Sequence, residues 1–144
     1  MKEFVDHLVK VERALAEKKG AFNLFALFLR EDAPDKWDLL IAASWVERNK
    51  PDTLKYIAQK LQKSLNKKEL LKLSRIVIID HGNPALDAFQ RAFHVEHGST
   101  EIQGSNLFGL QIKHAYLITS RRSRGPVSKK AIQPTAPVGG EAGG

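Results

Sequence analysis

Asp80 and His81 place a carboxylate beside an imidazole, and they are the first candidates for acid–base chemistry. Such a pair can move a proton to or from a substrate, or hold an anion. The ordinary alternative is turn and cap chemistry, because Asp-His-Gly-Asn-Pro is a good turn sequence. No nucleophile-elbow motif and no glycine-rich phosphate loop accompanies the pair. Asp80 and His81 are therefore the catalytic candidates if the protein is an enzyme.

The elements that would position this pair are a strand before it and a helix after it. Ile76–Ile79 are four consecutive β-branched apolar residues, which predict a central strand covered on both faces. Asn83 predicts a cap for the helix that follows. Asp80 and His81 would then lie at the carboxyl end of a central strand beside a helix N-terminus. Open sheets bind ligands at that end, and helix N-termini attract anions.

Three histidines are the candidate metal ligands. His94 and His97 are three residues apart, so they share a face if the predicted helix extends that far, and His114 lies on a predicted strand. Two or three imidazoles can hold zinc, but a functional zinc site also needs a fixed surrounding shell. A single histidine on an apolar face is more commonly a core residue with one hydrogen bond. We therefore predict no metal and no cofactor.

Asp32, Asp35 and Asp38 form an acidic cluster before the second predicted strand. Metal-dependent nucleases use such a carboxylate together with a Glu-x-Lys on the next strand, which hold Mg²⁺ and activate water. The later strands offer only Glu101-x-Gln103 and Gln111-x-Lys113. The missing acidic pair favours a solvated turn over a metal site.

Basic residues gather in one segment. The net charge is +7, and residues 48–75 alone hold nine Lys or Arg against two acids. Lysine outnumbers arginine there, which predicts loose phosphate contacts because bidentate reading of bases favours arginine. A solvated helix face is the ordinary alternative. The predicted polyanion contacts are Lys55, Lys60, Lys63, Lys67, Lys68, Arg121, Arg122 and Arg124.

Hydrophobic periodicity predicts nine elements in the order α-β-β-α-α-β-α-β-β. The order favours an α+β or three-layer α/β domain with a single mixed sheet of about five strands and helices packed on it. The predicted elements are a helix over 2–19, strands over 22–29 and 37–46, helices over 50–65 and 67–73, a strand over 76–79, a helix over 84–94, and strands over 99–104 and 109–120.

The segment Gly104–Gly109 predicts the turn of a hairpin. Leu107 and Phe108 at its tip either form an exposed protein contact or fold back under the sheet edge, and both interpretations stay open. The strand after the turn is predicted to carry alternate residues on one face, namely Leu110, Ile112, His114, Tyr116 and Ile118.

Length and composition predict one globular domain over residues 1–122 and a flexible Gly/Pro/Lys-rich tail over 123–144. The sequence has no cysteine, which excludes disulfides and thiolate chemistry. Its start lacks the features of a signal peptide, and its longest apolar run, Leu24–Leu29, is far shorter than the roughly 20 residues of a membrane helix. We expect a cytoplasmic protein without a membrane partner.

These observations favour a non-catalytic binding or accessory domain. Its partner would be a protein or a nucleic acid, met through the Lys-rich segment 50–72 and the basic tail. The alternative is a small hydrolase or transferase that acts on an anionic substrate at Asp80 and His81, with Asp38 or His114 supplying a further polar group. A homodimer formed by pairing of an edge strand such as 99–104 is a third expectation.

Overall fold

Strand β1 (Leu24–Arg30) is the middle strand of the sheet, and its first five residues are buried. We describe a computed structural model of residues 1–122, to which the statements below refer. The strand order is β3-β2-β1-β5-β4, with β2 and β3 parallel and the other pairs antiparallel. The single mixed sheet confirms the predicted α+β fold class. The other strands are β2 (Trp37–Ala42), β3 (Leu73–Ile78), β4 (Thr100–Leu107) and β5 (Leu110–Ser120).

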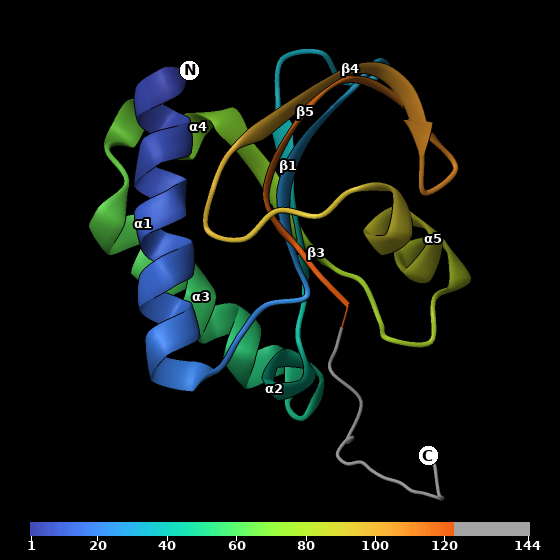
Figure 1. Ribbon diagram of the computed structural model, residues 1–144. Helices are drawn as coiled ribbons and strands as arrows, with labels where there is room; N and C mark the ends of the chain where they lie inside the picture. The colour runs from blue at the N-terminus through green and yellow to red at the C-terminus, as the bar shows by residue number, and fades with distance from the viewer. Residues whose placement is uncertain (123–144) are drawn as a thin grey trace, which may run out of the picture.

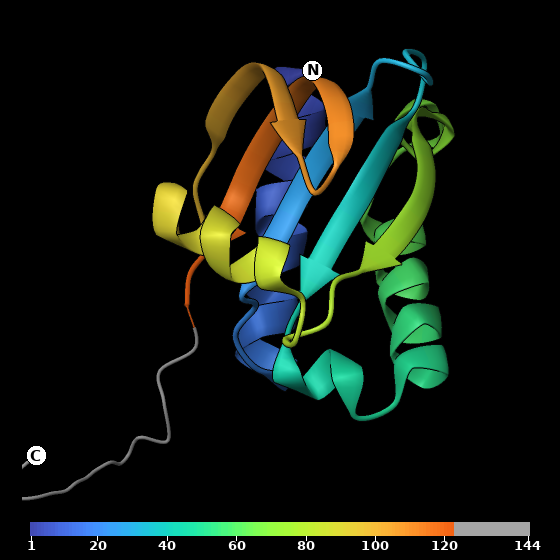
Figure 2. The ribbon, with the colours of Figure 1, turned by 90° about the vertical axis from the view of Figure 1, so that its right-hand side faces the viewer.

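Helices cover both faces of the sheet (Figures 1 and 2). One face carries α1 (Lys2–Lys19), α3 (Lys50–Ser64) and α4 (Lys67–Lys72), and the other carries α5 (Pro84–Ala92). Two apolar clusters result, because side chains alternate between the faces of a strand. Phe25 of β1 belongs to the α1 cluster and Phe28 to the α5 cluster. None of these helices is long and apolar enough to cross a membrane.

Local sequence sets the starts of three helices, and the predicted cap at Asn83 is confirmed. The side chains of Asn49, Asn66 and Asn83 accept hydrogen bonds from the first turns of α3, α4 and α5. The second predicted strand ends earlier than expected, since Ser44–Glu47 form the one-turn helix α2. This turn starts the crossover that joins the parallel strands β2 and β3, a connection that an antiparallel hairpin would not need.

The prediction that Ile76–Ile79 form a central strand is wrong, because β3 is an edge strand. Ile76 and Ile78 pack against the α1 cluster, while Val77 and Ile79 pack against the α5 cluster. The apolar run therefore reports that both faces are covered. The run does not indicate whether the strand is central or at an edge of the sheet. Side chains on the two faces do not reveal whether one or both sides of the backbone are hydrogen-bonded to a neighbouring strand.

The β4–β5 hairpin turns at only two residues, Phe108 and Gly109, both with positive φ as in a type I′ turn. The ring of Phe108 lies 6.0 Å from that of Phe28 and 5.2 Å from that of Phe89, between ring centroids. The tip thus folds back over the α5 cluster. β4 is the other edge strand, as predicted for 99–104, and the dimer that such an edge would allow stays a prediction.

The alternate residues of β5 that were predicted to share one face lie on two different faces of the sheet. Leu110 and Ile112 pack in the α5 cluster, while Tyr116 and Ile118 pack in the α1 cluster. The register with β1 shifts between Leu29 and Arg30, which accommodates an extra residue in β5. A β-bulge of this kind breaks strict alternation of the side chains.

Glu12 is a fully buried carboxylate that ties α1 to the sheet. Its Oε2 accepts a hydrogen bond of 2.7 Å from Thr119 Oγ1, and its Oε1 lies 2.6 Å from Nδ1 of His97. The Thr119 oxygen also accepts the backbone N–H of His97 at 3.1 Å. The φ of His97 is 50°, a conformation that is uncommon for residues other than glycine. The loop adopts it where His97 contacts Glu12 and Thr119. A buried charge is tolerated only when it is paired and hydrogen-bonded in this way.

Thr119→Val should lower the free energy of unfolding by about 1–3 kcal/mol, because Glu12 would lose a donor while staying buried. Urea denaturation followed by circular dichroism measures the change. The matched control is Thr100→Val at an exposed position of β4, which should stay within about 0.5 kcal/mol of the parent. Equal stability of Thr119→Val and the parent would show that the hydroxyl does not support the carboxylate.

Candidate functional site

Asp80 and His81 lie beyond the carboxyl end of β3, next to the end of the parallel strand β2. Each contacts a partner of opposite charge from the crossover. Asp80 Oδ1 is 2.7 Å from Nζ of Lys50, and this hydrogen bond raises the pKa of Lys50. The ring Nδ1 and the backbone N–H of His81 both contact the carboxylate of Glu47. The two residues of the predicted pair therefore contact separate partners in the crossover, and sequence reasoning missed Glu47.

A small hollow of about 200 Å³ opens beside His81. Asp87 and Arg122 line it and pair with each other at 3.2 Å, and Gln90 completes its polar wall. The volume is below the roughly 300 Å³ at which ligand pockets usually begin. The corner offers an imidazole and a guanidinium close together, but little room for a substrate.

Asp38 does not join this corner, so that expectation is wrong. It lies near the start of β2, opposite Arg75, at the other end of the strand from Ala42. Its side chain is buried and lies 3.2 Å from both Arg30 and Arg75. Asp38 is thus a buried carboxylate between a partly exposed Arg30 and a half-exposed Arg75, and it is not part of a solvated turn, because the strand begins one residue before it.

The three candidate metal ligands contact three different carboxylates. His94 lies 3.3 Å from Glu96, and His97 contacts Glu12. Nε2 of His114 lies 2.5 Å from Glu101, in an ion-pair contact that lacks hydrogen-bond alignment. Within residues 1–122, no three His, Asp or Glu side chains are grouped so that they could hold a metal ion. His114 also stays away from Asp80 and His81, since it pairs with Leu29 of β1.

His114 belongs to an aromatic group at the edge of the α1 cluster. Its ring stacks on Tyr116 with centroids 4.7 Å apart, and Trp37 contacts both rings. Burial, and to a smaller extent the charge of Glu101, raises the pKa of the Tyr116 phenol. Packing is sufficient to explain this group, since Trp37 is itself buried.

The predicted polyanion contacts separate into two groups. Lys55, Lys63, Lys67 and Lys68 are exposed on α3 and α4, and Lys60 of α3 is half-buried. Arg121 and Arg122 instead pair with Glu96 and Asp87 near α5, so they do not extend the lysine surface. Arg124 and the rest of the predicted tail lie outside the described residues.

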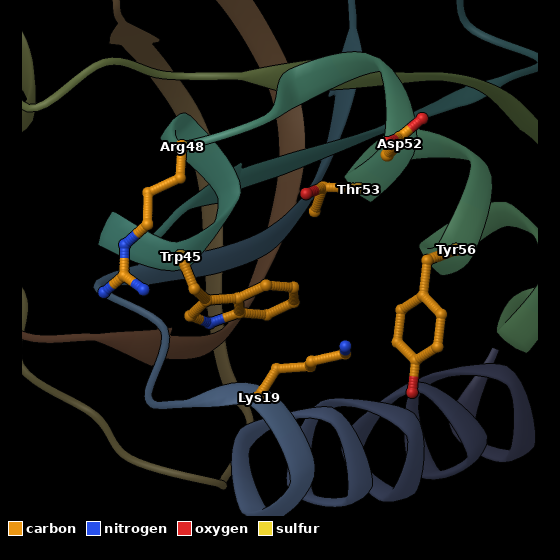
Figure 3. A pocket seen from close by; sticks show the side chains of 6 residues that line it. All are labelled: Lys19, Trp45, Arg48, Asp52, Thr53 and Tyr56. Atoms are coloured by element: carbon orange, nitrogen blue, oxygen red, sulfur yellow. The ribbon is translucent and has the colours of Figure 1, made fainter.

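The seam between α1 and α3, called the α1–α3 seam below, contains two hollows. The first, of about 420 Å³, is shown in Figure 3 and the second is about 290 Å³. Four cationic side chains line them, two from α1 and two from the crossover, against one carboxylate. The first hollow is lined by Lys19, Trp45, Arg48, Asp52, Thr53 and Tyr56, and the second by His7, Lys10, Val11, Ala14, Lys60 and Ser64.

Within residues 1–122, the seam cations make no ion pair with a carboxylate, a property they share with most of the exposed lysines of α3 and α4. Among the described residues, no ion pair involves Lys10, Arg48 or Lys60, and Lys19 sits over the ring of Tyr56 at 4.8 Å from its centroid. The sequence predicted only Lys60 of these. Lys10 and Lys19 belong to a helix of mixed charge, and no local signal places that helix beside α3.

The pKa of Tyr116 is expected to lie above 10, the ordinary pKa of tyrosine, because burial favours the neutral phenol. Tyr56→Phe leaves Tyr116 as the only tyrosine, and ultraviolet absorbance then follows its ionisation. Glu101→Gln should lower the midpoint without removing the shift. Because the pKa of Tyr116 is higher in the folded state, the neutral phenol contributes to stability below pH 10. This contribution is lost as pH rises through the folded-state pKa. A midpoint at or below 10 in the folded protein would contradict the burial of the phenol.

Comparison of the chain with protein-family models, with curated proteins and with solved structures finds no match. No relative therefore supplies a function. Among the candidate sites of residues 1–122, the α1–α3 seam combines two hollows with four cationic side chains that make no ion pair with a carboxylate.

Proposed function

We propose that this protein is a non-catalytic binding domain that holds a polyanion along the α1–α3 seam. The observation that carries the proposal is that four cations without an ion-pair partner in the described part of the chain line the two hollows of one helix–helix seam. Arginines elsewhere, such as Arg30, Arg75 and Arg122, lie against carboxylates and are already neutralised. Cations held close together without partners favour an external anion, since binding relieves their mutual repulsion.

The shape of the seam supports an extended partner. Its two hollows involve α1 residues from His7 to Lys19, and further lysines lie exposed beyond it on α3 and α4. A single small anion would meet only one or two of these charges. A chain of phosphates would meet several and would release counterions at each. The predominance of lysine suits such contacts, because an ammonium group binds phosphate without strict geometry.

The one carboxylate of the seam weakens this field little. Asp52 lies at the first turn of α3, where its Oδ2 accepts a hydrogen bond of 2.9 Å from the Asn49 side chain. A negative charge at a helix N-terminus is also compensated by the helix dipole. Asp52 therefore acts mainly on its own helix end.

Lys10→Gln combined with Lys60→Gln should weaken binding of a fluorescently labelled single-stranded 20-nucleotide DNA. Loss of two phosphate contacts should also flatten the slope of log affinity against log salt by about 1.4, at roughly 0.7 per contact. Polarisation titrations between low and moderate salt measure both quantities.

The matched control is Lys36→Gln with Lys113→Gln, which removes the same charge from residues that do not line the seam. The control should keep the parent slope. Absence of binding at low salt would reject the proposal, and equal losses in the two double variants would assign binding to net charge instead of the seam.

A second candidate is a hydrolase or transferase that acts on an anionic substrate at the Asp80–His81 corner. The observation that favours it is the Glu47–His81 pair beside the hollow that contains Arg122. The residues that line this hollow include no serine, threonine or tyrosine hydroxyl. The small volume and the existing Asp87–Arg122 pair make this the less favoured function.

His81→Ala tests the second candidate. It should leave oligonucleotide binding unchanged, because His81 is not part of the seam. It should also leave any hydrolysis of p-nitrophenyl phosphate at the same background level as the parent protein. Turnover by the parent that disappears in His81→Ala would establish the enzyme and demote the binding domain.

A further inference from the structure

We infer that the hollow between Trp45 and Tyr56 takes one unpaired base, so that the polyanion is a single-stranded nucleic acid. This inference rests on the proposed binding function of the α1–α3 seam and names its partner. The hollow has about 420 Å³, within the roughly 300–1,000 Å³ of ordinary ligand pockets. Its walls include two aromatic rings, and its polar groups are two cations, the Thr53 hydroxyl and the Asp52 carboxylate, as Figure 3 shows.

Trp45 is held as a fixed wall of this hollow. Its Nε1–H donates to the carbonyl of Gly20 at 2.8 Å, and its ring meets Phe22 edge-on with centroids 5.3 Å apart. The indole polar group is therefore satisfied within the protein. An aromatic surface that is already immobilised costs little entropy when a flat ligand stacks on it.

Gly20 permits this arrangement. Its φ of 133° lies in a region that other residues rarely adopt, and a Cβ there would come within 3.1 Å of Trp45 Cδ1. The helix end thus brings a carbonyl to the indole without a side chain in between. Lys19, the last residue of α1, directly precedes this turn and lines the hollow.

The position of Lys19 argues against a cationic ligand. Its ammonium already lies 4.8 Å above the centre of the Tyr56 ring, which is where a quaternary ammonium or a methylated lysine would sit. Arg48 adds a second positive charge beside Trp45, as Figure 3 shows. The ligand that fits is a flat ring that also carries negative charge.

A nucleotide has both properties. Its base can stack against Trp45, or against Tyr56 when Lys19 leaves that ring to meet the phosphate, and the Thr53 hydroxyl can donate to or accept from a polar edge of the base. Stacking accepts every base because each has a π-face, so little sequence preference is expected. A duplex would hide its base faces, so the strand must be single.

The second hollow differs from the first in the side chains that line it. Lys10, Lys60 and His7 line it with aliphatic residues and Ser64, and neither Trp, Tyr nor Phe contributes. Phosphates could bind there without a stacked base. The seam thus pairs one base pocket with a neighbouring cationic groove, the combination that proteins use to bind single strands.

Tyr56→Leu is the decisive variant, because it removes a stacking surface and keeps apolar packing. Its affinity for a 20-nucleotide oligothymidylate should fall about fivefold or more. Its affinity for inorganic polyphosphate, which has charge but no bases, should stay within about twofold. Tyr116→Leu is the matched control, since Tyr116 is also half-buried but lies in β5, and it should not change either affinity.

A second readout does not depend on a variant. Trp37 is buried, so quenching of tryptophan fluorescence by a small solute reports mainly on Trp45. Adenosine 5′-monophosphate should quench the fluorescence saturably, and ribose 5-phosphate should not. Equal behaviour of the two would overturn the base pocket.

The outcomes separate this inference from the function on which it rests. If Lys10→Gln with Lys60→Gln weakens both ligands but Tyr56→Leu affects neither, the base pocket is rejected and the polyanion-binding function stands. If neither oligothymidylate nor polyphosphate binds at low salt, both fail. Tighter binding of polyglutamate than of oligothymidylate would overturn the inference in favour of an acidic protein partner.

Discussion

Burial of β1 on both faces is the constraint on which the rest of the domain depends. Leu24, Phe25, Ala26, Leu27 and Phe28 are fully buried, and their side chains point alternately to the two faces of the sheet. A strand of this kind is stable only when a layer covers each face. The α1–α3–α4 layer covers one face, while α5 and the folded-back hairpin tip cover the other.

The buried carboxylate of Glu12 then fixes α1 against the sheet. Thr119 and His97 hold its two oxygens, so α1 cannot rotate about its axis without leaving a charge unpaired in the interior. Since side chains leave a helix in fixed directions, this contact also decides which α1 residues face α3. The position of Lys10 in the seam is therefore a consequence of an interaction on the opposite side of its helix.

Charge is distributed unevenly between the two helical layers. On the α5 side, basic residues such as Arg91 and Arg122 share the carboxylate of Asp87. Along the α1–α3 seam, Arg48 and Lys60 have no carboxylate partner among the described residues. This asymmetry, more than the total charge of +7, separates a surface suited to an anion from one that is internally neutralised.

The elements follow from the sequence alone, because their signals are local. Periodicity predicted which segments form strands and helices, and Asn49, Asn66 and Asn83 mark helix starts through contacts only two or three residues away. The edge position of β3, the place of Asp38 between two arginines, and the separate carboxylate partners of the three histidines become visible only in the folded chain. Lateral strand order and helix–helix contacts are set by pairings between distant residues. The hydrophobic pattern of the sequence indicates which side chains are buried. It cannot distinguish among alternative neighbours of a strand or helix, since each alternative buries the same side chains.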